Sequence, residues 1–374
     1  MEHTERISMR MARSVMRRYR SEQVKWHYEH GLVLQSVYAL GTAVGSDEYI
    51  TWVQAMYDTK INADGSINTY KKEEFNLDQI NPGKTLFDLY HLTGDEKYRK
   101  AIELLHAQLL HQPRTESSGF WHKKIYPHQM WLDGLYMQGP FYARYALEFG
   151  SPAELQDLVA QLVLVESKTR DAKTGLMYHA WDESRRQLWA NPQTGCSPHF
   201  WGRAMGWYCM AVVDTLDFIP AGVANQAYIN SLIAIGRRLT LAVIAYQDAE
   251  SSLWFQILDQ GKRDKNYLET SASSMFVYFL FKMLNKKYFE KDDTDLAASA
   301  RLCARSGYDA LVSRKLSEDA SGELHLNGIC SVAGLGGNPY RDGSYEYYVK
   351  EPVVADDFKG VGPFILASLE AEAT

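Results

Sequence analysis

Apolar side chains recur every three or four positions along most of this chain, which is the period of an amphipathic helix rather than of a strand. Residues 84–105 illustrate the pattern. A first apolar-periodic run ends at Gly94, acidic residues follow at once, and a second run begins. Glycine stops helices and acidic residues favour their first turn, so this segment predicts two helices joined by a tight turn.

The same pattern recurs along the chain, in segments 39–57, 145–165, 214–239 and 281–311. The predicted turns fall near residues 46, 94, 150, 221 and 290. A further helix is expected over residues 356–372. Self-similarity at a spacing of this order indicates a repeated helical hairpin.

The predicted connections between hairpins are long and rich in polar and aromatic residues; they cover 58–82, 111–130, 171–200, 248–269 and 313–355. Open helical solenoids use short connections, because each repeat touches only its neighbours. Long loops that recur at one end of a helical ring suggest a functional rim. We therefore expect an all-α fold, an (α/α)6 barrel of six hairpins, with residues 1–374 forming one domain.

Composition and charge exclude several classes of protein. Apolar residues make up 46% of the 374 residues, enough for a large core, and the net charge of −6 argues against a nucleic-acid partner. No run approaches 18 uninterrupted apolar residues, so no membrane span is expected. The N-terminus has no apolar signal core and the four cysteines form no C-x-x-C pair, which favours a cytoplasmic protein with reduced thiols.

Asp133 lies in MWLDGLYMQGP (130–140), a stretch otherwise dominated by apolar and aromatic residues. Burying a carboxylate is unfavourable unless it is paired or protonated. Burial also raises the pKa of a carboxyl group in general, which lets it act as a general acid near neutral pH. The simpler alternative is that Asp133 caps the start of a helix, where Asp is favoured.

Asp78 lies in FNLDQINPGKT (75–85), before a helix predicted to open at Pro82. On the simpler reading, Asp78 and Asn81 are turn and capping residues. On the functional reading, Asp78 shares a rim cleft with Asp133, and two neighbouring carboxyl groups push their pKa values apart so that one stays protonated.

Cationic and aromatic residues gather in the other predicted rim loops. His122 and Lys123 precede Asp133, and His179 lies in YHAWDE (178–183). A mixed cationic and aromatic run beside an acid suits an anionic sugar, although it also suits a solvated loop.

SPHFWGRAMGWY (197–208) adds Trp201, Arg203 and Trp207 near a helix start. Arg203 can bind a carboxylate through two parallel hydrogen bonds. Aromatic faces pack against sugar rings. A helix with tryptophans in its core explains the aromatic pair but not Arg203 between them.

Other motifs favour structural roles. NPGKT (81–85) lacks the first glycine of a phosphate-binding loop, and GLGGNP (334–339) is best interpreted as a loop. HYEH (27–30) lacks the rest of a zinc motif, which favours a polar helix face. Glu269 in NYLETSASS is expected to cap a helix.

Four segments together resemble the unsaturated rhamnogalacturonyl hydrolases of glycoside hydrolase family 105, and more distantly the unsaturated glucuronyl hydrolases of family 88. They are HKKIYPHQMWLDGLYMQGPF, SPHFWGRAMGWY, YLETSASSMFVYFL and YRDGSYEYYV…DDFKGVGPFILA. The resemblance implies an (α/α)6 barrel without a cofactor or metal, with Asp133 as acid/base and Asp78 as its partner. The positions matching the family's substrate contacts are Tyr28, His122, Lys123, His179, Trp201, Arg203 and Trp207.

The reaction implied by the resemblance is hydration of a C4=C5 double bond in an unsaturated uronate at the non-reducing end of a small oligosaccharide. The protein would then act as a monomer or homodimer without nucleic-acid or membrane partners. Three alternatives stay open: the same chemistry on unsaturated glucuronate from ulvan or glycosaminoglycans, an α/α-toroid epimerase or lyase, and a non-catalytic helical scaffold. The last predicts short connections and a polar concave face.

Overall fold

The computed structural model describes residues 5–289 and 293–373, and α-helices dominate this part of the chain. The helices are α1 (Ile7–Arg18), α2 (Tyr28–Val44), α3 (Asp47–Asp58), α4 (Leu86–Thr93), α5 (Glu96–Leu109), α6 (Leu132–Glu148), α7 (Pro152–Thr169), α8 (Gly202–Leu216), α9 (Gln226–Ala245), α10 (Thr270–Asn285), α11 (Thr294–Lys315), α12 (Tyr345–Lys350) and α13 (Phe358–Glu372).

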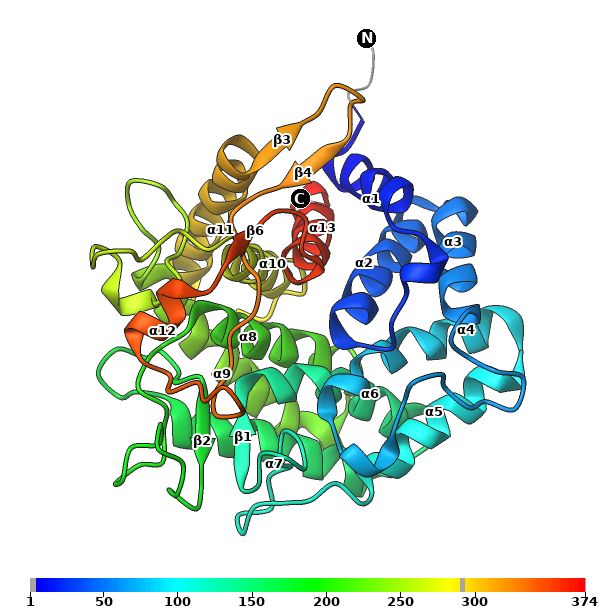
Figure 1. Cartoon of the computed structure of the whole chain (residues 1–374), viewed down its shortest axis with the longest axis horizontal. Helices are drawn as coiled ribbons and strands as arrows, with labels where there is room; N and C mark the ends of the chain where they lie inside the picture. Colours follow the sequence, from blue (N-terminus) through cyan, green and yellow to red (C-terminus); the bar gives the residue numbers. More distant parts are fainter. Residues whose placement is uncertain (1–4, 290–292, 374) are drawn as a thin grey trace.

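The helices form two concentric rings, and the chain follows one circuit from α1 to α13 (Figure 1). In the inner ring, α2 contacts the 3-10 helix η4 (Asn81–Thr85) that leads into α4; the ring continues through α6, α8, α10 and α13, and α13 contacts α2 again. Helices α3, α5, α7, α9 and α11 pack outside as the hairpin partners of inner helices, and α1 packs on α13. The predicted (α/α)6 barrel is confirmed.

The two ends of the chain complete the last hairpin. Ser8 in α1 donates hydrogen bonds from its amide and its hydroxyl to the Glu372 carboxylate in α13, at 3.0 and 2.5 Å. The ring is therefore closed by contact between the first and last helices rather than by a sequential turn.

Four of the five predicted hairpin turns are confirmed. Gly45 and Gly94 adopt left-handed backbone angles, with φ of 64° and 67°, and end α2 and α4. Gly accepts this conformation without strain, which is why it stops helices. Short connections near residues 150 and 221 join α6 to α7 and α8 to α9. The turn predicted near residue 290 lies outside the described residues.

The inner helices α8 and α10 are buried on every side. All residues of α8 are buried, as are those of α10 from Thr270 to Leu284. A helix surrounded by other helices needs no polar face. Close packing uses glycine: a Cβ at Gly206 in α8 would lie 2.8 Å from the Met275 sulfur in α10. Such contacts hold the inner ring at a tight radius.

The segment Val223–Ala245 is long and apolar enough to cross a membrane by length and composition. In the structure it contains α9, which packs against α7, α8 and α11. Arg238 of α9 donates from its Nε to Glu166 of α7 at 2.7 Å. Its apolar residues therefore serve helix packing in the outer ring.

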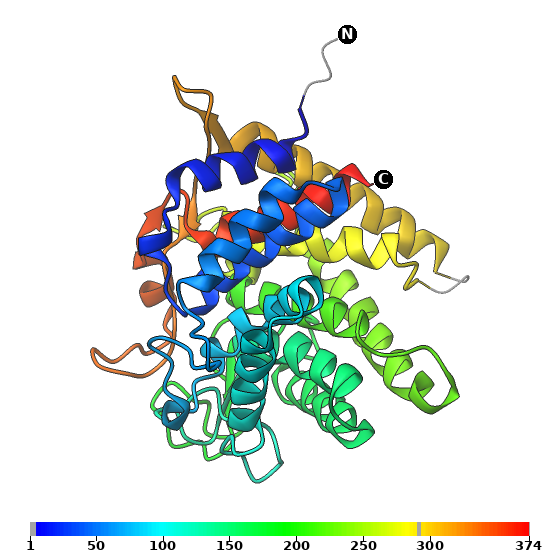
Figure 2. The ribbon, with the colours of Figure 1, turned by 90° about the vertical axis from the view of Figure 1, so that its right-hand side faces the viewer.

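The long connections gather at one end of the barrel, and the short hairpin turns at the other (Figure 2). The predicted rim at one end of the ring is therefore present, and each long connection precedes an inner helix. Within them lie strands that the sequence patterns did not reveal: β1 (Gln129–Trp131) pairs with β2 (Ala180–Asp182), β3 (Leu316–Glu318) with β4 (Leu324–Leu326), and β5 (Ile329–Cys330) with β6 (Val353–Val354).

Candidate active site

Backbone hydrogen bonds link neighbouring rim loops and set the positions of the candidate residues. The Leu77 amide donates to the His122 carbonyl at 3.1 Å, the His122 amide to the Gln129 carbonyl at 2.9 Å, and the Leu132 amide to the His179 carbonyl at 3.1 Å. The first and third bonds join the loop before one inner helix to the loop or helix start at the next, and the second holds the loop before α6 together. Asp78, His122, Asp133 and His179 each lie at or next to one of these bonds, so the rim brings them together.

Asp133 is the second residue of α6, and it does not cap the helix. The capping position is Trp131, which has extended backbone angles and makes no side-chain capping bond. Asp133 Oδ2 lies 3.3 Å from Nε2 of His179, and 14% of its side chain is exposed. The structure therefore places this carboxyl group against an imidazole at the rim, where its other face is open to a reactant.

The contact between Asp133 and His179 follows from strand pairing. Strands β1 and β2 are antiparallel, with Trp131 opposite Ala180. Leu132, the residue after β1, then lies opposite His179, the residue before β2. Asp133 follows Leu132 directly, so Asp133 and His179 project from the same end of the ribbon. Gly134 leaves room for the imidazole of His122, since a Cβ at position 134 would lie 2.9 Å from Nδ1 of His122.

Asp78 is paired with cationic and polar groups and is not a cap. It belongs to η3 (Leu77–Gln79), and the capping acceptor there is Asn76. Lys123 Nζ lies 2.5 Å from Oδ2 of Asp78, and His122 Nε2 lies 3.6 Å from its Oδ1. The helix predicted to begin at Pro82 starts as η4 and becomes α-helical only at Leu86.

Burial and neighbouring charges set the pKa values of Asp78 and His122. Burial raises the pKa of Asp78, but Lys123 and His122 outweigh burial, so the net pKa lies below its ordinary value. Burial lowers the pKa of His122 to about 4, against the opposing effect of Asp78. At neutral pH, Asp78 is therefore an anion beside a lysine cation and a neutral imidazole.

Aromatic rings pack around this group. The Trp131 ring stacks on His122 with centroids 4.7 Å apart and on Tyr126 at 4.8 Å, and it meets His179 edge-on at 5.2 Å. Trp201, the residue that precedes α8, lies 4.7 Å from the His179 ring. These rings hold both imidazoles in fixed orientations.

Tyr28 and Trp207 form a second aromatic wall. Tyr28 is the first residue of α2, and its ring meets that of Trp207 edge-on at 6.0 Å. Trp207 in turn stacks on Tyr136 at 5.1 Å. The charges of Asp78 and Asp133 both act on Tyr28, after burial, to raise its pKa well above the usual value. Tyr28 therefore lies at the same site as both carboxyl groups.

Arg203 differs from the expected two-pronged carboxylate grip. Its Nε donates to Ser271 Oγ at 2.8 Å, its Nη2 donates to the Cys330 carbonyl, and Glu269 lies 3.5 Å away. Only 1% of Arg203 is exposed. Most of its hydrogen bonds are used to join α8, α10 and β5, because these buried acceptors require a donor.

Glu269 caps α10, as predicted. Its carboxylate accepts from the amides of Ser271 at 3.2 Å and Ala272 at 2.6 Å. It also accepts from the Cys330 amide at 2.9 Å. The cap therefore fixes β5 and helps to position Arg203.

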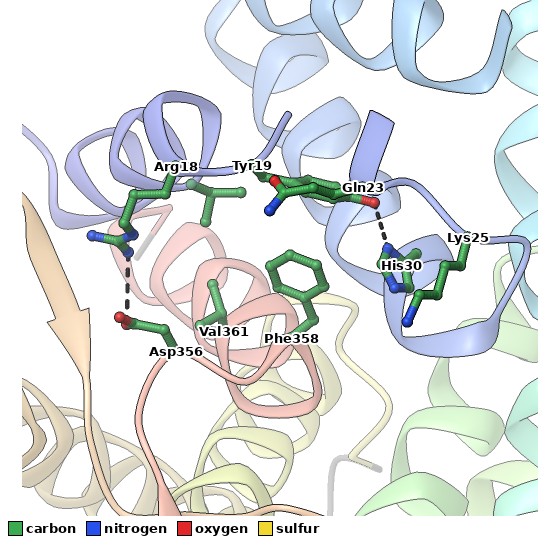
Figure 3. Close-up of a pocket in the computed structure, with 9 residues that line it drawn as sticks. Arg18, Tyr19, Gln23, Lys25, His30, Asp356, Phe358 and Val361 are labelled. Carbon is green, nitrogen blue, oxygen red and sulfur yellow. Dashed lines mark hydrogen bonds and ion pairs between the residues drawn. The ribbon is translucent and has the colours of Figure 1, made fainter. Parts of the chain in front are cut away.

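The side chains of the HYEH motif lie on different sides of α2. Tyr28 faces the site, whereas His30 lines a cavity of about 550 Å³ between α1, α2 and α13 (Figure 3). Tyr19 and His30 contact each other there, and Arg18 faces Asp356. Glu29 pairs with Lys359 at 2.9 Å. Among residues 5–289 and 293–373, no group of three or more His, Cys, Asp and Glu side chains is placed to hold a metal ion.

Two residues of the site were not predicted. Tyr348 of α12 has its hydroxyl oxygen 2.7 Å from Nδ1 of His179. Gln256 accepts a hydrogen bond from the Trp201 indole at 3.0 Å and donates to the Tyr348 carbonyl at 3.1 Å. Tyr348 lies in the YRDGSYEYYV segment (340–349) that contributed to the resemblance, but no local pattern connects Tyr348 or Gln256 to Asp133.

Comparison with known proteins places this geometry in a family. The family model described as Glycosyl Hydrolase Family 88 matches residues 5–374. The chain belongs to the family 88 and family 105 glycosyl hydrolases. A solved family 105 glycoside hydrolase from C. acetobutylicum is 44% identical, with a TM-score of 0.93 over 99% of this chain and 100% of that one. The resemblance stated from the sequence is confirmed.

Two further relatives differ in the substrates that their names give. The unsaturated rhamnogalacturonyl hydrolase YesR of Bacillus subtilis is 27% identical over 295 residues, covering 77% of this chain and 79% of that protein. An unsaturated glucuronyl hydrolase from Bacillus sp. GL1 is 12% identical, with a TM-score of 0.69 over 98% of this chain and 95% of that one. The second likeness shows the fold alone.

Proposed function

We propose that this glycosyl hydrolase removes unsaturated galacturonyl residues from the non-reducing end of rhamnogalacturonan oligosaccharides. The observation that carries the proposal is the pairing of two unlike carboxyl environments: Asp133 against His179, and Asp78 against Lys123. Support for the substrate comes from the similarity to YesR. The rim also offers a lysine, the neutral imidazole of His122 and aromatic faces, which suit an anionic sugar ring.

The reaction begins at the C4=C5 double bond, which is both an enol ether and an unsaturated acid. Protonation at C4 creates an oxocarbenium-like centre at C5. Water adds to C5 and gives up a proton, which forms a hemiketal. The hemiketal opens to a C5 ketone, and the hemiacetal left at C1 expels the aglycone as an alcohol. One water is consumed for each oligosaccharide cleaved.

Asp133 is proposed to supply the proton to C4 and then, as the carboxylate, to take one from the attacking water. The two transfers return Asp133 to its starting state. General acid–base steps of this kind contribute roughly 100- to 10,000-fold in rate. The route differs from direct displacement at the anomeric carbon, which needs a nucleophile or a base on the opposite side.

Asp78 is proposed to remain ionised throughout. Its ion pair with Lys123 and its lowered pKa make it a fixed negative charge near the developing cationic centre. A fixed charge aimed at charge that develops in the transition state lowers the barrier without reorganisation. This division of roles matches the rule that neighbouring carboxyl groups take different protonation states.

The remaining rim residues are proposed to bind substrate. Lys123 is the cation with an accessible side chain beside Asp78, 21% exposed, and is placed to meet a uronate carboxylate. Tyr28 and Trp207 offer ring faces for the sugar. Arg203 is assigned an indirect role, since protein acceptors occupy most of its donors. Small imported pectin fragments as substrates also fit a cytoplasmic location.

The test follows the ultraviolet absorbance of the conjugated double bond with unsaturated galacturonyl-rhamnose as substrate. Wild type should abolish the absorbance, and Asp133→Asn should leave it unchanged while its circular dichroism and melting temperature stay near wild type. Asp64→Asn is the matched control, since Asp64 is exposed and accepts hydrogen bonds within its own turn, at 2.9 Å from the Ser66 amide. Full activity in Asp133→Asn contradicts the proposal.

The second candidate is the same hydration on unsaturated glucuronate, supported by the match of the chain to the family 88 model. Parallel assays with ulvan and glycosaminoglycan disaccharides distinguish the two. If only the glucuronyl substrates lose absorbance, the chemistry stands and the proposed sugar is wrong. If the absorbance rises with an intact polysaccharide, the protein is a lyase and the hydration proposal fails.

A further inference from the structure

A second cavity lies along the barrel axis, at the end opposite to the candidate active site. It has a volume of about 480 Å³, within the range of roughly 300–1,000 Å³ that is usual for small-molecule sites. Helices α2, α6 and α8 begin at the rim and end at the short hairpin turns (Figure 2), and their later parts line the cavity. The lining residues Thr42, Ala43 and Asp217 are exposed, so the mouth of the cavity lies at the short-turn end.

A buried aromatic layer separates this cavity from the active site. The Trp207 ring meets that of Tyr28 at 6.0 Å and stacks on Tyr136 at 5.1 Å. Tyr136 and Trp207 are 0% and 1% exposed. Lys84, which lines the cavity, has its Nζ 3.3 Å from the centroid of the Tyr136 ring. A molecule in the cavity would therefore lie beneath the floor of the active site and not within it.

Ion pairs occupy most of the charged groups that line the cavity. Lys282 contacts Asp214 at 2.7 Å and Asp217 at 2.6 Å. Arg144 contacts Asp88 at 2.8 Å. These cations and carboxylates compensate one another, so none of them requires a charged ligand.

Two polar groups in the same cavity have no hydrogen-bond partner among residues 5–289 and 293–373. They are Nζ of Lys84 in η4 and Oε1 of Gln35 in α2, and both atoms are buried. Buried polar groups in native structures nearly always have a partner, either in the protein or in a bound molecule such as water. The two atoms therefore indicate that the cavity holds a molecule able both to accept and to donate hydrogen bonds.

We propose that this cavity is a second ligand site, which binds a neutral, polyhydroxylated molecule of about the size of one sugar ring. The inference goes beyond the proposed function and does not depend on which uronide the active site cleaves.

The charges of the lining favour a neutral ligand. The carboxylates are Asp88, Asp214, Asp217 and Glu370, and the cations are Lys84, Arg144 and Lys282. An anion would approach the carboxylates, and a cation would approach the amino and guanidinium groups. A hydroxyl group both donates and accepts hydrogen bonds. A polyol can therefore accept from Lys84 and donate to Gln35 without bringing a charge into the cavity.

The cavity also has an apolar wall, which suits the C–H face of a sugar ring. It is formed by Pro140, Phe218, Leu366 and Leu369. Small-molecule sites generally combine such apolar surface with a few placed polar groups. The combination distinguishes this cavity from a wholly polar, water-filled channel.

Lys84 opposes folding as long as its amino group has no partner. Burial lowers the pKa of Lys84 well below its ordinary value, although Asp214 opposes the effect. Burial of a polar group without a hydrogen bond is unfavourable, and a ligand hydroxyl that accepts from Nζ would offset that cost. A perturbed group of this kind inside a cavity is typical of a functional site.

The test titrates the whole chain with two neutral sugars, L-rhamnose and D-galactose, and follows binding by isothermal titration calorimetry. Inorganic phosphate and spermidine serve as anionic and cationic comparison probes. We expect saturable binding of at least one sugar, weakened about 3- to 10-fold in Lys84→Met and in Gln35→Leu, the size expected for one lost hydrogen bond. Lys100→Met, at an exposed position of α5, is the matched control and should bind as wild type does.

Two further variants separate this cavity from the rim, where the same sugars could also bind. Ala39→Leu narrows the cavity and keeps its polar groups, so it should weaken sugar binding. Lys123→Met alters the rim beside Asp78 and should leave this binding unchanged. Circular dichroism and thermal melts establish that each variant is folded.

Three results would overturn the proposal. Sugar affinity that falls in Lys123→Met but not in Lys84→Met or Ala39→Leu would place the sugar at the rim. Absence of saturable sugar binding would mean that water alone fills the cavity. Saturation by phosphate or spermidine alone would show that the ligand is charged. None of these results requires cleavage of a uronide, so the proposed function can fail while the second site stands.

Discussion

Lys123 and Asp78 form an ion pair of 2.5 Å at the rim, and this pair sets the charge of the site. Asp78 is buried, at 5% exposure, and could not remain ionised there without a counter-charge. Lys123 supplies that charge while keeping part of its side chain accessible. The lysine therefore has two partners available, the fixed carboxylate and the carboxylate of an incoming uronate.

Replacing Lys123 by Met should impair both functions. Without the cation, burial dominates and the pKa of Asp78 rises, because burial is the largest influence on it. We expect kcat/KM to fall about 100-fold, or roughly 2.7 kcal/mol of transition-state stabilisation, with most of the remaining activity at higher pH. Initial rates over a pH series measure both effects.

Lys124→Met is the matched control for Lys123→Met. Lys124 is the next residue, is exposed, and its Nζ reaches the Glu73 carbonyl at 3.5 Å and lies 5.8 Å from the centroid of the Phe75 ring. Its removal should change kcat/KM by less than about twofold, since exposed charges contribute little. Equal losses in the two variants would show that the rim depends on net positive charge rather than on the Asp78 pair.

Gly134→Ala tests the close approach of His122 to the start of α6. The added methyl group would lie 2.9 Å from buried Nδ1 of His122, so the imidazole must shift. Overpacking of this kind typically costs about 1–3 kcal/mol, and displacement of His122 should also reduce kcat. Thermal melts and initial rates measure the two effects.

Gly139→Ala in the same helix separates packing from helix propensity. A methyl group there meets nothing nearer than Thr215 Oγ1, at 3.3 Å. Alanine favours helix by up to about 1 kcal/mol over glycine, so this variant should be neutral or slightly stabilised and fully active. A loss of activity as large as that of Gly134→Ala would argue against a specific His122 clash.

The barrel could be predicted from the sequence because its signal is local. Hairpin turns at Gly45 and Gly94 follow from glycine conformation, and the helices follow from the spacing of their apolar residues. Turns such as those closed by the Asp171 and Asp248 side chains recur after outer helices. This repeated Asp-x-x-Thr/Ser pattern was available in the sequence and would have located the ends of those helices.

The contacts of the site could be predicted only in part, because they join distant loops. Asp133 and Asp78 were identified from their chemical setting, but the 3.3 Å contact of Asp133 with His179 depends on the register of β1 and β2. Tyr348 enters from the far side of the ring. Arg203 was expected to bind substrate directly, and carbonyls of a distant loop occupy its donors instead. Such contacts form between loops that are distant in the sequence, so no local pattern predicts them.

Acid should destabilise the protein through its buried histidines. Burial lowers the folded-state pKa of His122 to about 4, and that of His30 also to about 4. The unfolded chain binds protons near pH 6.5, so it gains protons first and stability falls between about pH 6.5 and 4. For His122 the full loss is roughly 3 kcal/mol, at 1.36 kcal/mol for each pKa unit.

His122→Asn should flatten this part of the curve of melting temperature against pH, and His111→Asn, at an exposed position, should leave it unchanged. The lowered pKa of Asp78 acts in a separate window, since the stability it contributes is lost only as the pH falls below the ordinary aspartate range. A curve for His122→Asn that parallels wild type from pH 6.5 to 4 would contradict the assignment.

Lys84 lies beneath the site and should be replaceable with a gain in stability. It is 5% exposed, and its Nζ has no hydrogen-bond partner within the described residues. Burial lowers the pKa of Lys84 well below its ordinary value, although Asp214 opposes the effect. Because the folded pKa is depressed, the unfolded chain binds the proton more tightly, and Lys84 opposes folding at every pH below its ordinary pKa.

Lys84→Met keeps a chain of similar length and removes the charge. The variant loses the contact of Nζ with the Tyr136 ring, 3.3 Å from its centroid, which is worth up to about 2 kcal/mol when desolvated. Replacing even a buried ion pair by apolar side chains often stabilises other proteins by about 1–4 kcal/mol, and Lys84 has no hydrogen-bonded partner within the described residues, so the net change should be stabilising at neutral pH and vanish above the ordinary lysine pKa. Lys282→Met is the contrasting variant, because Lys282 pairs with Asp214 at 2.7 Å and Asp217 at 2.6 Å. It should destabilise by about 3–5 kcal/mol, since it leaves buried carboxylates without a counter-charge. Denaturant melts at neutral and alkaline pH compare the two, and a destabilised Lys84→Met would mean that the lysine is charged and held by its aromatic neighbour.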